Sequence, residues 1–229
     1  MRFQHKSDGL HLATHRWTNV YLLTRGEESV LVDTGMDATG LKILHALDGH
    51  PPVQRILLTH AHFDHSGGAA ALSAGLGVDV FAHPDDAALL RTGTWRRPGE
   101  GVPKWAEALF ASMTPGKVMP LPNVRELTDA GPLNWPGAEL FPLPGHSAGQ
   151  VGFRLPRADG GSIWIVGDAL MTLTGVSRPL GFESKSEGLA SIRALAGRVA
   201  EGDLLCPGHG PPLRVSSVVQ ARLAKIATP

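Results

Sequence analysis

Short apolar runs alternate with stretches of helical periodicity along most of this chain. The runs are no longer than about six residues, the usual length of a strand buried in a sheet. Predicted strands cover residues 20–23, 29–32, 55–58, 78–82, 138–143, 151–155, 162–166 and 204–206. Predicted helices cover residues 39–47, 67–74, 84–90, 187–199 and 216–226. Strands that alternate with helices in this way are typical of α/β proteins.

Two stretches, residues 91–123 and 171–185, fall outside this regular pattern. The first contains four large apolar side chains and a predicted helix over residues 103–113. These side chains are Trp95, Trp105, Phe110 and Met113. Either the two stretches form walls of a substrate pocket, or the aromatic side chains dock a helix on the core or join two copies of the chain. Both interpretations stay open, and we expect a monomer or a homodimer.

The length and charge of the chain limit what it can bind. With 229 residues, a single domain over 1–229 buries about 70–75% of its extended surface, so a large core is available. Lys and Arg number 21, equal to the 21 Asp and Glu, and this balance leaves no basic excess for nucleic acid. We therefore expect a small-molecule substrate and no nucleic-acid partner.

The N-terminus and the cysteine count indicate a reducing compartment. Residues 1–9 are charged and polar where a secretory signal would have an apolar region. No apolar run approaches the eighteen or so residues of a membrane span, so no membrane partner is expected. The one cysteine, Cys206, has no partner for an internal disulfide. These features favour a cytoplasmic location.

Residues 59–68, Thr-His-Ala-His-Phe-Asp-His-Ser-Gly-Gly, concentrate metal-binding side chains. His60 and His62 are two positions apart, so in an extended segment their side chains lie on the same side and can bind one ion. Asp64 and His65 follow where the chain turns toward a helix, and they point to a neighbouring volume. The spacing predicts a metal site, with a second ion beside the first.

Three later loops each place one further candidate ligand after or near an apolar run. The candidates are His146, Asp168 and His209, each next to a glycine. Because strand ends converge at one edge, these loops can meet the first cluster at a single point. Cys206 also lies near His209, but the leucines before it favour a buried strand thiol over a ligand. The six other histidines are interpreted as surface or capping residues, with His83 as a candidate for contact with the ligands.

The ordered ligands resemble those of the metallo-β-lactamase superfamily, in its binuclear hydrolase branch of glyoxalase II and lactonase type. The resemblance covers essentially the whole chain, from Leu-Val-Asp-Thr-Gly at 31–35, similar to an early strand-turn motif, to Pro-Gly-His-Gly at 207–210. It implies an α/β fold, the αβ/βα four-layer sandwich, in which two sheets face each other, helices lie outside and the metals lie at one edge.

The resemblance also implies two divalent ions, with zinc preferred and iron or manganese as alternatives. In this assignment His60, His62 and His146 bind the first ion, Asp64, His65 and His209 bind the second, and Asp168 bridges both. Two such ions about 3.5–4 Å apart lower the pKa of a shared water from 15.7 to roughly 7, which makes a bridging hydroxide the expected nucleophile. Asp64 is the candidate catalytic residue for proton transfer, because one carboxylate oxygen can bind metal while the other faces the water.

Residues near Asp168 separate the possible reactions. Members of the family that cleave β-lactams have Cys or Ser at the position of Asp168, so lactamase activity is not expected as the main function. Lactonases acting on acyl-homoserine lactones have Tyr where this chain has Met171. Thioester hydrolases of the glyoxalase II type have a C-terminal helical segment, which is not expected here because the chain ends about twenty residues after His209.

We therefore predict a metal-dependent hydrolase that attacks an ester-like bond, in a lactone, a thioester or a related ester. A neutral, partly apolar substrate is favoured, although Lys104, Lys117, Arg178 and Lys185 in the irregular stretches offer an alternative anionic site. The alternative reaction class is that of the mononuclear iron persulfide dioxygenases, whose Gly-Asp-Ala-Leu stretch residues 167–170 resemble. A phosphodiesterase and a non-catalytic metal-binding relative are further alternatives.

Overall fold

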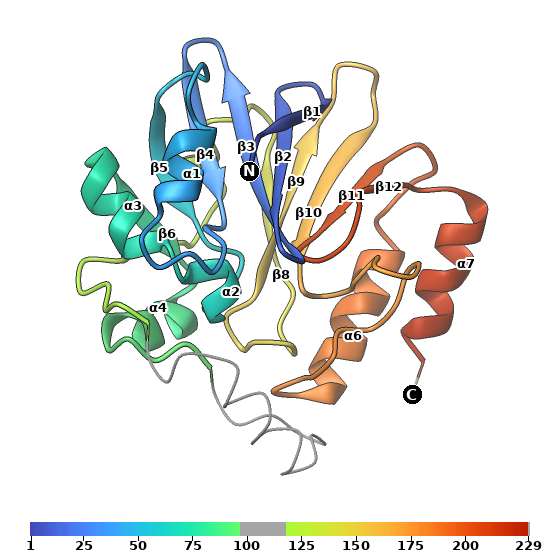
Figure 1. Cartoon of the computed structure of the whole chain (residues 1–229). Coiled ribbons are helices and arrows are strands. Elements are labelled where there is room, and N and C mark those ends of the chain that lie inside the picture. The colour runs from blue at the N-terminus through green and yellow to red at the C-terminus, as the bar shows by residue number, and fades with distance from the viewer. Residues whose placement is uncertain (97–117, 229) are drawn as a thin grey trace.

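Two β-sheets face each other in this computed structural model, which describes residues 1–96 and 118–228 (Figure 1). The first sheet has the order β1-β2-β3-β4-β5-β6-β7 and the second the order β12-β11-β10-β9-β8. The strands of the first sheet are β1 Gln4–Ser7, β2 Leu10–His15, β3 Thr18–Arg25, β4 Glu28–Val32, β5 Val53–Leu57, β6 Asp79–Ala82 and β7 Arg125–Glu126. Those of the second are β8 Glu139–Pro142, β9 Val151–Pro156, β10 Ser162–Gly167, β11 Leu204–Pro207 and β12 Leu213–Arg214.

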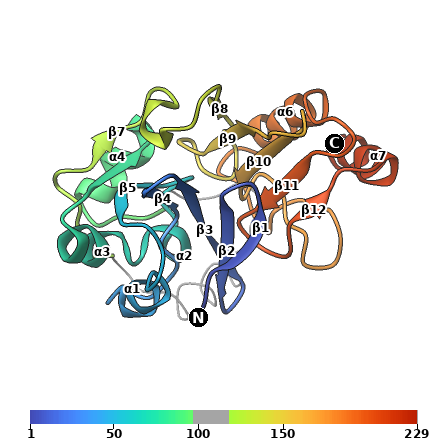
Figure 2. The same cartoon turned by 90° about the horizontal axis from the view of Figure 1, so that it is seen from above.

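Helices cover the outer faces of both sheets (Figures 1 and 2). Beside the first sheet lie α1 Leu41–Ala46, α2 Phe63–Ser66, α3 Ala69–Leu76 and α4 Pro84–Arg91, with the 3-10 turn η1 Gly131–Leu133 after β7. The second sheet is covered by α6 Lys185–Ala196 and α7 Ser217–Ile226. Within residues 1–96 and 118–228, no helix has the length and apolar character needed to cross a bilayer.

Alternating side chains along the strands form three apolar layers. Ile163 and Ile165 of β10 lie in the cluster between the sheets, whereas Trp164 between them packs under α6 and α7. In the first sheet Tyr21 faces the other sheet and Val20 faces the helices. This alternation follows from the two-residue period of a strand. Three buried interfaces separate four layers, so the predicted αβ/βα sandwich is confirmed.

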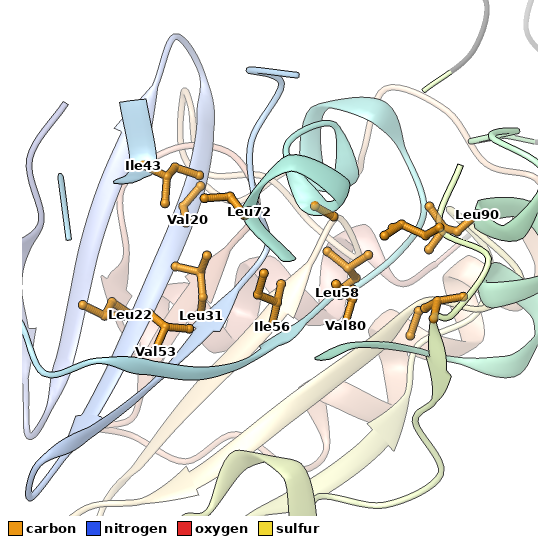
Figure 3. Packing of buried hydrophobic residues seen from close by; sticks show 14 of the residues in the cluster. Val20, Leu22, Leu31, Ile43, Val53, Ile56, Leu58, Leu72, Val80 and Leu90 are labelled. Atoms are coloured by element: carbon orange, nitrogen blue, oxygen red, sulfur yellow. The ribbon is translucent and has the colours of Figure 1, made fainter. Parts of the chain in front are cut away.

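The outer apolar layer of the first sheet shows how the helices are held (Figure 3). Ile43 of α1, Leu72 of α3 and Leu90 of α4 pack on strand side chains, and each is at most 1% exposed. Burying one such side chain stabilises the fold by about 1.5–3 kcal/mol. The strand side chains in this layer include Val20, Leu22, Leu31, Val53, Ile56 and Val80, and Leu58 joins them directly after β5.

All predicted strands and helices that fall on described residues are present, with shifted ends. The predicted helix over residues 103–113 lies outside the described residues, as do Trp105, Phe110 and Met113. Four strands were not predicted: β1, β2, β7 and β12. β7 and β12 have two residues each, and β1 is an exposed edge strand of polar side chains, so an apolar pattern is missing.

The ends of several strands lie along one edge of the sandwich. β9 is antiparallel to both β8 and β10, and β10 is parallel to β11, so β8, β10 and β11 run in the same direction. The start of β3 lies at this edge too, because Thr18 forms a β-bridge with His209, just after β11. Loops from both sheets therefore meet at this edge, rather than loops from one sheet alone.

Candidate metal centre

The histidine-rich segment leaves β5 and forms a single helical turn. His62 has extended dihedrals, φ −55° and ψ 143°, and α2 begins immediately after it. The turn is closed by the Ser66 hydroxyl, which donates a hydrogen bond to the carbonyl of Ala61 at 2.7 Å. The extended segment before the helix and the helical turn itself therefore present two different groups of side chains, as their spacing predicts.

The other three candidates come from the second sheet. His146 lies between β8 and β9, Asp168 follows β10 directly, and His209 follows β11. Gly208 allows these loops to come together, because a Cβ there would lie 2.1 Å from Oδ1 of Asp168. A residue with a side chain at this position would displace the carboxylate.

The structure brings all seven candidate ligands together. Three sets of ligand atoms each lie within 4.8 Å of one another. The sets are His60, His62 and His146; His60, His65 and Asp168; and Asp64, His65 and His209. The first and third sets divide the residues as the family resemblance implies, and the second links them through Asp168.

Two histidines are oriented by backbone carbonyls. His146 Nδ1 lies 2.8 Å from the oxygen of Gly181, and His209 Nδ1 lies 2.8 Å from the oxygen of Trp17. A carbonyl oxygen only accepts hydrogen bonds, so both Nδ1 atoms carry a hydrogen. The Nε2 atoms therefore face the centre, where they can serve as metal ligands.

Two more histidines are oriented through Asp33. His65 Nδ1 donates to Oδ2 of Asp33 at 2.9 Å. The Thr59 hydroxyl also donates to this carboxylate, at 2.9 Å and 3.1 Å from its two oxygens. Because that hydroxyl has one hydrogen, it accepts from His60 Nδ1, 3.0 Å away. His60 and His65 thus also turn Nε2 toward the centre, in the way that ligating histidines are usually held.

The converging atoms fit a metal site. In the described part of the chain, His60 Nε2, His146 Nε2 and Asp168 Oδ1 are buried side-chain atoms with no hydrogen-bond partner. Leaving such an atom unpaired costs about 1–3 kcal/mol, so a cation that binds all three would recover a substantial penalty. Imidazole nitrogens and carboxylate oxygens are suitable ligands for zinc, iron or manganese.

The protonation states of the histidines divide the centre into two parts. Burial, together with neighbouring histidines, holds the pKa values of His60 and His62 well below the ordinary value. Burial also acts to lower the pKa of His65, but the charges of Asp168, Asp64 and Asp33 raise it to about 9. Burial likewise acts to lower the pKa of His209, but its interactions with Asp168 and Asp64 raise it to about 11.

The two carboxylates are ionised. Burial acts to raise the pKa of Asp64, but the charge of His65 and a hydrogen bond with His209 lower it to about 2. The same balance against His65 and His209 lowers the pKa of Asp168. Asp64 is also the more accessible of the two, since its side chain is 14% exposed and that of Asp168 is 4% exposed.

Two residues that contact the candidate ligands, Asp33 and Thr18, had no predicted role. Asp33 was noted only as part of a strand-turn motif, yet it is buried and orients His65. Its positive φ of 63° is unusual for a residue with a side chain. The Thr18 hydroxyl lies 3.4 Å from Oδ2 of Asp64 and can donate to it. A carboxylate directly after a buried strand was the available signal for Asp33, but nothing marked Thr18.

The segment 171–185 packs against the C-terminal helix and the His146 loop. Arg178 donates hydrogen bonds to the carbonyls of Ile226 and Thr228, so its guanidinium is held at the C-terminal end of α7. On the other side, the amide of Ala148 donates to the Glu183 carboxylate at 2.8 Å. The segment therefore supports one of the candidate ligands. Lys104 and Lys117 lie outside the described residues.

Side chains outside the ligand set have other roles. Cys206 is fully buried between the sheets, where burial raises the pKa of its thiol, in agreement with the predicted strand thiol. His83 caps α4 by accepting from the amide of Asp85. Two ring pairs were not predicted: His11 lies 5.5 Å from His5 and 5.0 Å from His50, between ring centroids.

Known proteins include several that are similar to this chain. The family model described as "Metallo-beta-lactamase superfamily" matches residues 15–217. A hydroxyacylglutathione hydrolase from Anaeromyxobacter dehalogenans is 45% identical over 71 residues, which are 31% of this chain and only 27% of that protein. A protein from Streptococcus pyogenes named "Probable metallo-hydrolase" is 26% identical over 198 residues, 84% of this chain and 79% of its own.

One solved structure is similar over almost the whole chain. It is a crystal structure of TTHA1623 in a di-iron-bound form, with 30% sequence identity and a TM-score of 0.64. The match covers 90% of this chain and 93% of that one.

Proposed function

The chain belongs to the metallo-beta-lactamase superfamily, and from this membership and the geometry of the centre we propose a binuclear metallo-hydrolase that cleaves an ester-like bond. His60, His62 and His146 would hold the first ion, and Asp64, His65 and His209 the second, with Asp168 between them. One observation carries the proposal: imidazole Nε2 atoms converge on Asp168. Two of these nitrogens are buried without a hydrogen-bond partner among the described residues. Zinc is the preferred ion for these ligands.

Two bound ions would supply a water of pKa roughly 7 at this centre and stabilise negative charge on the carbonyl oxygen. Asp64 suits the movement of a proton because it is ionised and the more exposed of the two carboxylates. Thr18 orients Asp64 through its hydroxyl. We propose that Asp64 takes a proton from the attacking water and passes it to the leaving group.

Two exposed apolar residues, at or next to the backbone carbonyls that contact ligand histidines, favour a partly apolar ester. Trp17 is 46% exposed, and its carbonyl is hydrogen-bonded to His209. Leu180 is 89% exposed and precedes Gly181, whose carbonyl is hydrogen-bonded to His146. A thioester is the preferred substrate class, because hydroxyacylglutathione hydrolases are among the relatives of the chain.

Metal content and a substrate panel together test this function. Protein purified without added metal or chelator is analysed by elemental mass spectrometry and assayed on thioesters, lactones, phosphodiesters and a β-lactam. We expect close to two equivalents of metal and the highest kcat/KM on a thioester or lactone. One equivalent of iron with oxygen-dependent turnover of a persulfide would instead support the dioxygenase class, and folded protein without metal would contradict the metal centre.

Replacing Asp64 by asparagine separates metal binding from proton transfer. The amide of the new side chain keeps an oxygen that can bind metal but cannot take a proton, so we expect kcat to fall about 10²–10⁴-fold while much of the metal is retained. Turnover and metal content are measured on the same preparation. Full activity with both metals bound would exclude a role for Asp64 in proton transfer.

Metal binding is expected to release protons from one part of the centre only. Near pH 7.5, His65 and His209 each carry an extra proton because their pKa values are about 9 and about 11, whereas His60 and His62 are neutral. A metal must displace protons from its ligands, so affinity at His65 and His209 rises with pH up to about 9, by roughly 100-fold per pH unit. Affinity at the other group changes little over this range.

Calorimetric titration with zinc, in buffers of different ionisation enthalpy, counts the protons released. We expect about two protons to be released in total. All of them should be released when the zinc equivalent with the more strongly pH-dependent affinity binds. Release of equal numbers of protons with the two equivalents would contradict this division of the centre.

A further inference from the structure

A buried carboxylate on α4 is attached to the first ligand segment. Asp86 lies in the first turn of this helix and is 0% exposed. Its Oδ2 accepts a hydrogen bond from the amide of Ala61 at 2.7 Å. Ala61 is the residue between His60 and His62, so Asp86 holds the backbone at the centre of the segment that presents both side chains.

The same carboxylate is attached to the loop of His146. The hydroxyl of Ser147, the next residue along the chain, lies 2.7 Å from Oδ1 and 2.8 Å from Oδ2 of Asp86. The amide of Gly149 donates to Oδ1 at 3.1 Å. A Cβ at Gly149 would lie 2.6 Å from the carboxylate carbon, so this close approach requires glycine.

We propose that Asp86 is a positioning residue that sets the distance between the two parts of the first metal group. One part, residues 60–62, follows the first sheet, and the other, His146, follows a strand of the second sheet. Asp86 joins them through backbone and hydroxyl donors without belonging to any of the sets of ligand atoms. The inference rests on the proposed function, since it assumes that this group holds an ion.

The chemistry of the site requires a carboxylate. Three donors converge on Asp86 from Ala61, Ser147 and Gly149, and an ionised carboxylate offers only acceptors. An asparagine amide would direct its own N–H groups at some of these donors. The position in the first turn of α4 further stabilises the negative charge, because the N-terminus of a helix carries partial positive charge.

The effect of Asp86 is measured in two variants, each of which keeps only one of the two proposed metal groups intact. His209→Ala removes a ligand of the second group and leaves the first, whereas His62→Ala does the reverse. Adding Asp86→Asn to His209→Ala is expected to raise the Kd for zinc about 10–100-fold, the usual effect of losing a residue that orients ligands. Adding it to His62→Ala is expected to change the Kd by less than about threefold, as for independent sites. The Kd is measured by competition with a chromophoric chelator.

A neighbouring residue and a milder variant serve as controls. Asp85→Asn changes a carboxylate on the same helix turn whose side chain is 60% exposed, and it should leave both Kd values unchanged. Ser147→Ala removes a single donor, so it should shift the first group in the same direction by a smaller factor. This variant tests the inference even if Asp86→Asn does not fold.

The outcomes separate this inference from the proposed function. An equal loss of affinity in both backgrounds, or no loss in the first, would overturn a positioning role for Asp86. A His209→Ala variant that binds no zinc would overturn it as well, because the first group could not then hold an ion alone. Failure of the unsubstituted chain to bind zinc would instead overturn the proposed function itself.

Discussion

Replacing Asp168 by alanine is expected to lower kcat/KM at least about 10³-fold and to reduce metal content. Oxygens of this carboxylate lie 3.0 Å from Nε2 of His209, 3.4 Å from that of His65 and 3.5 Å from that of His146. In the proposed centre it would thus lie between the two ions. Stabilisation of the transition state by metals is worth several kcal/mol, and losing about 4 kcal/mol corresponds to a factor of about 10³.

The measurement combines kinetics on the best substrate of the panel with elemental mass spectrometry. Asp79→Ala is a suitable control, because Asp79 lies on the surface of β6 and forms an ion pair with Arg125 at 3.0 Å. This control should keep wild-type activity within about twofold, as expected for a surface substitution. An Asp168→Ala protein that kept both ions and more than about a tenth of its activity would contradict the bridging role.

A strand that is buried on both faces is the part of the fold that the sequence predicts most directly. β10 is buried along its whole length, because one of its faces packs on the opposite sheet and the other on α6 and α7. Such a strand is a continuous apolar run, which sequence shows directly. β1, by contrast, is polar and mostly exposed, and it is specified by its pairing with β2. That pairing depends on the rest of the sheet and has no local apolar signal.

The candidate ligands could be predicted because the chemistry of metal binding restricts residue types and spacing. Four of the seven lie within residues 60–65, and the others lie beside glycines. The residues that orient them carry only weak local signals, since Asp33 and Asp86 contact partners 25 to 63 positions away. Asp86 had one local signal: it shares the buried face of α4 with Leu90, four positions on, where a carboxylate is costly unless hydrogen-bonded.

The orienting contacts also explain why the centre can keep its shape. Gly181 and Trp17 supply backbone carbonyls to two histidines, and a carbonyl accepts a hydrogen bond whichever side chain its residue carries. These contacts are therefore tolerant of substitution at the residue that supplies them. Asp33 is different, because it orients His65 through a side chain that no other residue type reproduces.

Replacing Asp33 by asparagine is expected to lower activity at least about 100-fold by changing the tautomer of His65. The amide oxygen would remain with the backbone N–H of Thr59, which now donates to Oδ1 at 2.8 Å. The NH2 group would then face His65 Nδ1, so this nitrogen must accept and the hydrogen moves to Nε2. A protonated Nε2 cannot bind metal, and the second group should lose affinity for zinc about 10–100-fold.

Stability and the tautomer give independent readouts of this substitution. Asparagine tolerates the positive φ at this position, so any loss comes from the hydrogen bonds: about 1–3 kcal/mol, or roughly 2–12 °C in Tm for a chain of this size. Nitrogen-15 NMR of the histidine rings in metal-free protein, recorded above the His65 pKa of about 9 so that the ring is neutral, should show His65 with hydrogen on Nε2 in Asp33→Asn, and hydrogen on Nδ1 in the partly exposed control Asp37→Asn. If the Asp33→Asn protein keeps hydrogen on Nδ1 and binds the second zinc normally, Asp33 is not what orients His65, and the ring must be held by its packing in the fully buried centre instead.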